Sequence, residues 1–273
     1  MEELIKYQSH LLGMAKHQIN KETFPRFVIL IGARGSGKKS VTHEICKMLN
    51  ANEVICGNGI NDIREIKNNV IRTKTVYVFL DADNMSIQAN NSLLKFTEEP
   101  RKDVYIIMTV ESLGNVAKTL QSRAVVYLMD AYKPNELGEY SEKYDSKRNC
   151  TKYLYESLCD TPGECDLLYK QNPQEFYDYV SKVVDNIATT SGSNVFKIAD
   201  KIALKDSDDG YDLILFWKCF NKVIFDRRFH MSGIRITNEY LRYAKSKAIN
   251  KQTLFDNWIL DIREKWRKEN EQE

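Results

Sequence analysis

The segment GARGSGKKS, residues 32–40, contains the residue types and spacing that most directly suggest chemistry. Gly32, Gly37 and Lys38 match the frame of a phosphate-binding loop, in which Gly and four further residues precede Gly-Lys. Such a loop places backbone N–H groups around phosphate oxygens at a helix N-terminus, and glycines such as Gly35 let the backbone approach closely. The lysine reaches the outer phosphates. The sequence therefore predicts an anion-binding loop, with ATP or ADP as the candidate ligand.

The residue that should hold Mg²⁺ is missing from this loop. A Ser or Thr hydroxyl normally follows the lysine. Here Lys39 occupies that position, and an ammonium repels Mg²⁺ and offers it no oxygen. Ser40 comes one residue later, about 100° further round a helix, and would point elsewhere. We therefore predict a degenerate loop that includes Lys39 and Ser40; the alternative is a Gly-rich turn that caps a helix and binds no ligand.

Acidic residues follow a candidate strand at Leu80-Asp81-Ala82-Asp83. An ATP-hydrolysing site needs such residues at a strand end, one to hold the metal and one to orient water. The two carboxylates are not adjacent in the sequence, so neither register gives a complete acidic pair. Asp81 is assigned to the nucleotide site, and the alternative for Asp81 and Asp83 is a helix N-cap.

Alternating strand-like and helix-like stretches must position these residues. FVILI at 27–31 is a continuous apolar run that ends at the glycine-rich loop, which is typical of a buried parallel strand followed by a helix. The remaining predicted strands and helices of this part are strands at 76–81, 104–110 and 124–129, and helices at 2–18, 41–49 and 86–98. This order predicts a doubly wound α/β domain over residues 1–130.

Helical patterns replace strand-like runs after Pro134. Breaks at Thr161-Pro162-Gly163 and Asn172-Pro173 divide these patterns. The sequence therefore predicts a small helical subdomain at 131–172 and an all-helical domain at 173–273.

The composition limits the ligands and the cellular compartment that we expect for this protein. Apolar residues make up 42% of the chain and charged residues 29%, and 40 basic and 38 acidic residues give a net charge of +2. This balance gives no overall attraction to nucleic acid or membranes. The six cysteines form no CxxC pair, so we expect free thiols and no zinc. The first residues lack a signal-peptide pattern and the longest apolar run is too short to span a bilayer, so we expect a cytoplasmic protein.

Three motifs resemble those of one family. Residues 82–100, ADNMSIQANNSLLKFTEEP, resemble the segment A-D-K-M-T…A-N-x-L-L-K-x-L-E-E-P of bacterial clamp-loader subunits. Residues 119–124, TLQSRA, resemble the family's T-x-x-S-R-C motif with Ala124 in place of Cys, and residues 61–66, NDIREI, resemble its I-R-x-I segment. The chain is thus similar to the AAA+ clamp-loader family, above all to delta-prime subunits of the bacterial DNA polymerase III clamp loader, in a compact or phage-like version.

The resemblance implies a P-loop AAA+ domain, a helical lid and a helical collar. It also implies that Leu80 stands where active motor subunits have a metal-binding Asp, Asp81 where they have a catalytic Glu, and Gly163 where they have a phosphate-sensing Arg. Together with Lys39, these departures predict a subunit that does not hydrolyse ATP. Many relatives insert a four-Cys zinc module before the second strand, but residues 50–60 are too short for one.

The resemblance gives Arg123 a role. In the family, this arginine acts as a finger on the nucleotide of the neighbouring subunit; the alternative is a surface arginine paired with an acid at the sheet edge. Thr109 corresponds to a polar sensor at a strand end, with strand propensity as the alternative explanation for a Thr there. Glu98, Glu99 and Pro100 are expected to shape a helix end and a subunit contact.

The predicted partners are the motor and delta-type subunits of a hetero-oligomeric ring within a DNA polymerase holoenzyme. Through that ring the protein would act on the sliding clamp and on primer–template DNA. Two rivals stay open. One is an active ATPase of the same fold, a motor subunit or helicase loader that uses Lys38, Ser40 and Asp81. The other is a nucleotide-binding regulator that acts alone.

Overall fold

The computed structural model describes eight stretches of the chain, at 6–68, 73–98, 101, 103–144, 151–190, 200–204, 210–244 and 250–271. The chain divides into two compact units. The first comprises Met1–Glu136 with Thr161–Gly163, and the second comprises Leu137–Asp160 with Glu164–Glu273. The predicted three-part division at 131 and 173 stays a prediction.

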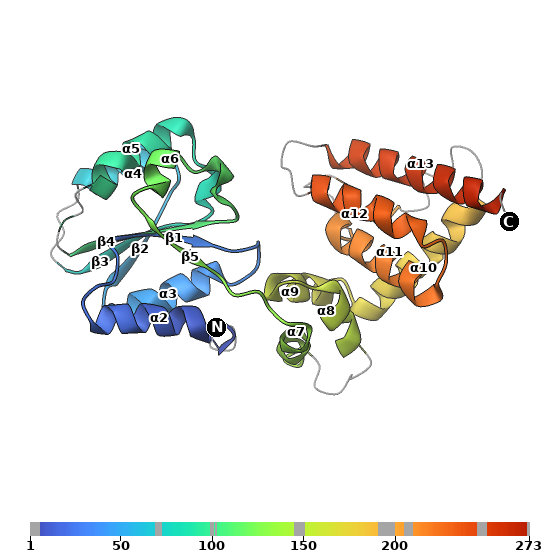
Figure 1. Ribbon diagram of the computed structural model, residues 1–273, viewed down its shortest axis with the longest axis horizontal. Helices are drawn as coiled ribbons and strands as arrows, with labels where there is room; N and C mark the ends of the chain where they lie inside the picture. The colour runs from blue at the N-terminus through green and yellow to red at the C-terminus, as the bar shows by residue number, and fades with distance from the viewer. Residues whose placement is uncertain are drawn as a thin grey trace. The chain divides into compact units, whose positions relative to one another are not determined.

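A five-stranded parallel sheet forms the centre of the first unit (Figure 1). Its strand order is β2-β3-β4-β1-β5, so β1 lies between β4 and β5. The strands are β1 (Phe27–Ile31), β2 (Asn52–Cys56), β3 (Thr75–Phe79), β4 (Val104–Val110) and β5 (Val125–Leu128). Because all strands run the same way, the loops that follow them meet at one edge of the sheet.

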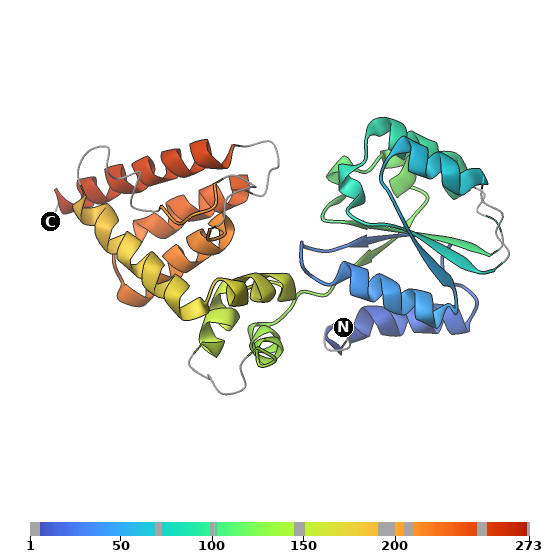
Figure 2. The ribbon, with the colours of Figure 1, turned by 180° about the vertical axis from the view of Figure 1, so that it is seen from behind.

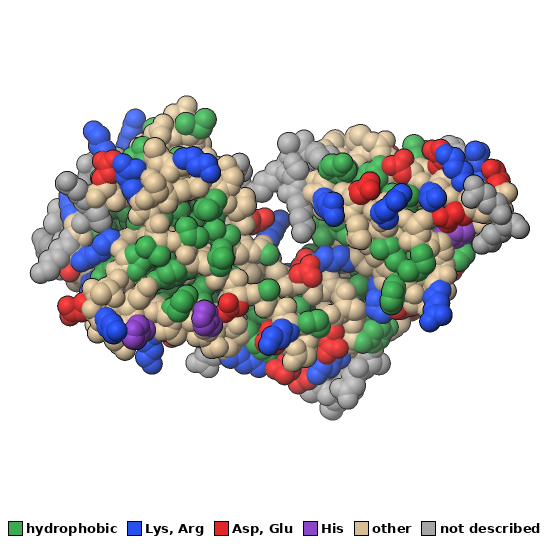
Figure 3. Space-filling view, in the orientation of Figure 1, with side chains coloured by type: hydrophobic (Ala, Val, Ile, Leu, Met, Phe, Trp, Pro, Cys, Tyr) green, Lys and Arg blue, Asp and Glu red, His purple; other side chains and the backbone are tan. Residues whose placement is uncertain are grey.

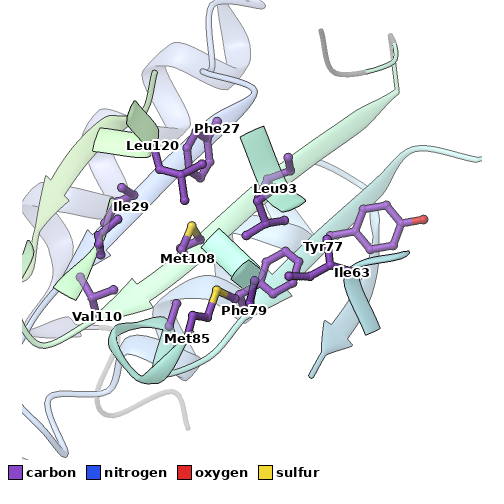
Figure 4. Close-up of a cluster of buried hydrophobic side chains, with 14 of the residues drawn as sticks. Phe27, Ile29, Ile63, Tyr77, Phe79, Met85, Leu93, Met108, Val110 and Leu120 are labelled. Carbon is purple, nitrogen blue, oxygen red and sulfur yellow. The ribbon is translucent and has the colours of Figure 1, made fainter. Parts of the chain in front are cut away.

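Helices cover both faces of this sheet, as Figures 1 and 2 show from opposite sides. One face carries α2 (Ser9–Asn20) and α3 (Lys38–Met48), and the other carries α4 (Ile60–Asn68), α5 (Ile87–Glu98) and α6 (Lys118–Gln121). Alternate residues of β1 serve the two layers: Val28 and Leu30 join the core on the α2 side, and Phe27 and Ile29 join the core shown in Figure 4. This explains why the buried strands are apolar throughout.

The structure confirms the predicted strands and the helices at 41–49 and 86–98 with small shifts of their ends. The helix predicted at 2–18 is observed as α2, which begins only at Ser9, and residues 1–5 lie outside the described residues. β3 ends at Phe79, so Leu80 and Asp81 lie in the turn that follows rather than in the strand. α3 begins at Lys38, directly after the glycine-rich loop. β2 and α4 were not predicted. β2 is an edge strand whose side chains are only half-buried or exposed, so its sequence, NEVIC, shows no continuous apolar run.

The described part of the second unit is built from helices, with one isolated bridge between Ile202 and Tyr211. The helices from Pro134 onward are α7 (Pro134–Ser141), α8 (Lys152–Leu158), α9 (Pro162–Lys170), α10 (Pro173–Thr189), α11 (Leu213–Arg227), α12 (Ser232–Ala244) and α13 (Lys251–Asn270). The predicted fold class, a parallel-sheet domain followed by helices, is confirmed.

Aromatic side chains fill much of the helical core. Trp217 and Phe220 of α11 pack with Trp258 and Trp266 of α13, and all four are buried. The Trp258 indole N–H donates to the Thr237 hydroxyl of α12 over 3.0 Å, which gives a buried donor its partner. None of the described helices is both long and apolar enough to cross a membrane.

Candidate functional site

The glycine-rich loop links β1 to α3, as the sequence predicts. β1 ends at Ile31, and α3 begins at Lys38. Gly35 and Gly37 have φ of 77° and 89°, in the left-handed region that side chains disfavour. The two glycines therefore give the loop a backbone path that other residues would adopt only with strain.

Five successive carbonyls of this loop, those of residues 32 to 36, accept hydrogen bonds. The Lys38 ammonium donates to the first two, with Nζ 2.8 Å from the oxygen of Gly32 and 3.1 Å from that of Ala33. In this conformation Lys38 closes back over its own loop. It would have to exchange these bonds for phosphate oxygens in order to bind a nucleotide.

The other three carbonyls bind residues distant in the sequence. The Thr161 hydroxyl donates to the Arg34 carbonyl over 3.1 Å, and the Gly163 N–H donates to the Gly35 carbonyl over 3.0 Å. The Tyr132 hydroxyl donates to the Ser36 carbonyl over 2.7 Å. The segment Thr161–Gly163 thus packs directly on the loop, within the same compact unit.

Only glycine fits on both sides of this contact. A Cβ atom on Gly163 would lie 2.6 Å from the Gly35 Cα, and one on Gly35 would lie 2.8 Å from the Gly163 Cα. The resemblance placed Gly163 where relatives carry a phosphate-sensing arginine. In this chain that position instead makes a close backbone contact with the phosphate loop.

Burial weakens the charged form of Lys38. Its side chain is almost completely enclosed, and desolvation lowers its pKa below 10.5, although Asp81, Glu111 and Asp83 act in the opposite direction. Burial thus disfavours the Lys38 cation, and the three carboxylates favour it. The same carboxylates repel a phosphate, so Lys38 and the backbone N–H groups of the loop would have to hold an anion against them.

Asp81 and Thr109 meet at the carboxyl edge of the sheet. The Asp81 N–H donates to the Thr109 hydroxyl over 3.0 Å, and Thr109 is paired with Leu30 of β1. Asp81 has φ of 50° and stands at the N-cap position of the short helix at Ala82–Asn84, but its side chain makes no capping hydrogen bond there. The structure thus brings Lys38, Asp81 and Thr109 to one end of the sheet, where they were expected.

The residues next to the loop do not fit a bound Mg²⁺ ion. Lys39 is exposed on α3 and Ser40 is half-buried. Leu80 is half-buried and packs against the core beneath α2 and α3, so it offers the site no oxygen from its side chain. Across the described residues there is no cluster of three or more His, Cys, Asp or Glu side chains that could hold a metal ion. The strand–loop–helix geometry suits an anion, and neither Lys39 nor Leu80 offers a side-chain oxygen to a metal ion.

Arg123 does not join this group. It precedes β5, whose Val125 pairs with Val28 near the start of β1, whereas the loop follows Ile31 at the other end of that strand. Three residues of strand separate these positions, or roughly 10 Å. Arg123 therefore lies toward the opposite edge of the sheet from its own phosphate loop.

The Arg123 guanidinium is held by two acceptors. Nη1 donates to the Thr119 carbonyl over 2.7 Å, and Nη2 lies 2.8 Å from Glu98 Oε1. This is the ion pair that the alternative for Arg123 describes. α5 is described as far as Glu98, and Glu99 and Pro100 lie outside the described residues, so their expected role at a helix end stays a prediction. Sequence reasoning did not foresee the pairing of Glu98 with Arg123, although both belong to the quoted motifs.

Parallel sheet, glycine-rich loop and following helices define the class as a P-loop-like α/β domain with a helical domain after it. Comparison with known proteins gives the same class of protein. A family model described as "DNA polymerase III, delta subunit" matches residues 56–133, and all three motifs lie within this range. The resemblance to clamp-loader subunits of DNA polymerase III is therefore confirmed.

Two curated relatives carry related names. The chain is 29% identical to "DNA polymerase III subunit gamma/tau" of Mycoplasma genitalium over 42% of its length, and 25% identical to "DNA polymerase III subunit delta'" of Bacillus subtilis over 47%. The matches span only 25% and 39% of those two proteins.

Solved structures show the same fold at low identity. A gamma subunit-related protein of DNA polymerase III from Thermotoga maritima matches with a TM-score of 0.52 and 16% identity, over 93% of this chain and 99% of that one. The RuvB Holliday junction branch migration motor of the same organism matches with a TM-score of 0.51 and 18% identity, over 84% of this chain and 76% of that one.

Proposed function

We propose that this protein is a delta-prime-like clamp-loader subunit that does not hydrolyse ATP itself and supplies Arg123 to a nucleotide held by a neighbouring subunit. The observation that carries the proposal is the position of Arg123 away from its own phosphate loop. An arginine placed there stabilises phosphoryl charge only on another chain. Such a finger contributes orders of magnitude to the rate of phosphoryl transfer.

Three departures at the loop support a lack of hydrolysis. Lys39 replaces the Mg²⁺-binding hydroxyl, and Leu80 replaces a metal-binding carboxylate. Gly163 replaces the phosphate-sensing arginine and closes on the loop through Gly35. Lys38 and the backbone N–H groups of the loop would hold the phosphates of a bound ATP or ADP. Under this proposal the bound nucleotide would stabilise the loop and would not be hydrolysed. No residue at this site is assigned to cleave it.

The proposed partners are the motor and delta-type subunits of a ring that loads the sliding clamp onto primer–template DNA in the cytoplasm. On the face shown in Figure 3, basic and acidic side chains are interspersed over both units rather than gathered in one field. This face therefore suits contacts with protein subunits better than non-specific DNA binding by one chain, which needs a continuous basic surface.

The test is reconstitution of the complex with motor and delta-type subunits and measurement of clamp- and DNA-stimulated ATP turnover. We expect Arg123→Ala to lower turnover about 100-fold or more, because phosphoryl charge loses its partner. Arg64→Ala, which removes an exposed arginine from α4, is the matched control and should leave turnover unchanged. Unchanged turnover with Arg123→Ala would refute the finger assignment.

ATP turnover by the isolated protein distinguishes our proposal from the rival hypothesis of an active ATPase. The convergence of Lys38, Asp81 and Thr109 at one edge is the observation in its favour. It predicts ATP turnover by the isolated protein that is abolished by Lys38→Ala and insensitive to Arg123→Ala. Our proposal predicts no turnover above background by the isolated protein.

A further inference from the structure

We infer that Glu98 is a positioning residue for Arg123: its carboxylate holds the guanidinium in one orientation while leaving donors for a phosphate. This inference rests on the proposed function, because it concerns the same trans-acting arginine. The starting point is the pair of contacts at the guanidinium, 2.8 Å from Nη2 to Glu98 Oε1 and 2.7 Å from Nη1 to the Thr119 carbonyl.

Two contacts on different nitrogens fix the plane of a guanidinium. The group has five N–H donors in a rigid planar arrangement, so two bonds leave three donors unused by these contacts. A long side chain that is already oriented loses less freedom when it meets a phosphate than one that rotates freely. The arrangement therefore suits an arginine that must reach a partner's anion without first becoming ordered.

Both acceptors stand on helix ends that the core holds in place. Glu98 is the last residue of α5, and Thr119 lies in the short helix α6. Leu93 of α5 and Leu120 of α6 are fully buried in the same cluster, which Figure 4 shows. A carboxylate at a helix C-terminus is unfavourable by itself, and the cation of Arg123 offsets it. Glu98 is thus paired with Arg123 on a rigid support.

Solvent exposure sets how firmly the pair is held. The side chains of Arg123 and Glu98 are 35% and 48% exposed, so water screens the ion pair. Such a pair restricts the arginine, yet a nucleotide with several phosphate charges competes with a single carboxylate for it. Glu98 therefore orients the finger in the free subunit without preventing its transfer to the partner's nucleotide.

The experiment is a double-mutant cycle in the reconstituted complex, with kcat and KM for ATP measured separately. We expect Glu98→Ala to lower kcat about fivefold, the rate equivalent of a weak exposed ion pair, with KM unchanged. The kcat of Glu98→Gln should lie between those of wild type and Glu98→Ala, because the amide oxygen still accepts from Nη2 but carries no charge. Glu65→Ala, an exposed glutamate of α4, is the control and should have no effect.

The combination with Arg123→Ala separates positioning from a structural role. If Glu98 acts through Arg123, the double variant turns over ATP at the rate of Arg123→Ala alone. A further loss in the double variant, or a kcat with Glu98→Ala or Glu98→Gln that equals or exceeds wild type, would overturn the inference. If Arg123→Ala itself has no effect, the proposed function fails, whatever Glu98 does.

Discussion

At the scale of residues, the phosphate loop is held closed by its own lysine and by glycine backbone. Lys38 binds two loop carbonyls, and the Gly163 N–H binds a third. The contact between Gly35 and Gly163 is so close that neither residue leaves room for a side chain. The pairing of Gly35 with Gly163 is therefore the local feature whose loss is most informative.

We expect Gly163→Ala to destabilise the α/β unit by about 1–3 kcal/mol, the usual cost of forcing a methyl into a filled space. The added Cβ would lie 2.6 Å from the Gly35 Cα, which is backbone and cannot move aside cheaply. Urea unfolding followed by circular dichroism measures the effect. Gly13→Ala is the control: it is on α2 with no atom near its new Cβ, and the protein should become slightly more stable. Equal stability of the two variants would contradict the close contact.

The buried Lys38 also makes a pH-dependent contribution to stability. Because desolvation lowers its pKa in the folded state, the unfolded chain binds more protons in the window between the folded pKa and 10.5. The free energy of unfolding of the wild type should therefore rise with pH, relative to Lys38→Met, as pH increases through that window. Denaturant titrations of both proteins from pH 7 to alkaline pH, as far as both remain folded, test this; a constant difference, or one of opposite sign, would count against it.

At the scale of elements, the sequence predicted those strands that are continuous apolar runs. FVILI and VYIIMTV are continuous apolar runs because each packs between two helical layers. β2 escaped prediction because its sequence, NEVIC, has no continuous apolar run, whereas the other edge strand, β5, has the run VVYL although most of its side chains are exposed. The loop could be found from spacing and Arg123 from the family motif, whereas the contact of Gly163 with Gly35 could not, since it joins segments more than a hundred residues apart.

The helical core offers a separate test. Thr237→Val should destabilise the helical unit by about 1–3 kcal/mol, because the buried Trp258 indole N–H loses its acceptor while the volume hardly changes. Thermal unfolding with tryptophan fluorescence measures this. Ser157→Ala, which removes an exposed hydroxyl of α8, serves as the comparison and should leave the midpoint nearly unchanged. A Thr237→Val protein as stable as wild type would show that the hydrogen bond contributes nothing.

At the scale of the whole molecule, the described cysteines are free and mostly enclosed: Cys46, Cys159, Cys165 and Cys219 are buried, and Cys56 is half-buried. Burial raises the pKa of the Cys46 and Cys56 thiols to about 12, so little thiolate exists at pH 8. We expect slow alkylation of these five residues by iodoacetamide in the folded protein and rapid alkylation in denaturant, mapped by mass spectrometry. Fast labelling of Cys46 in the folded protein would contradict the structure.

The strand order has a consequence for symmetry. The phosphate loop follows the end of β1, whereas Arg123 lies before the start of β5, so the two lie toward opposite edges of the parallel sheet. An arginine that serves the next chain makes a head-to-tail contact between unlike surfaces, which no two-fold dimer reproduces. Under the proposed function, the protein would complete a catalytic site only at its Arg123 end. A row of subunits built on such contacts would then have a defined polarity, with this chain at one end of its series of working sites.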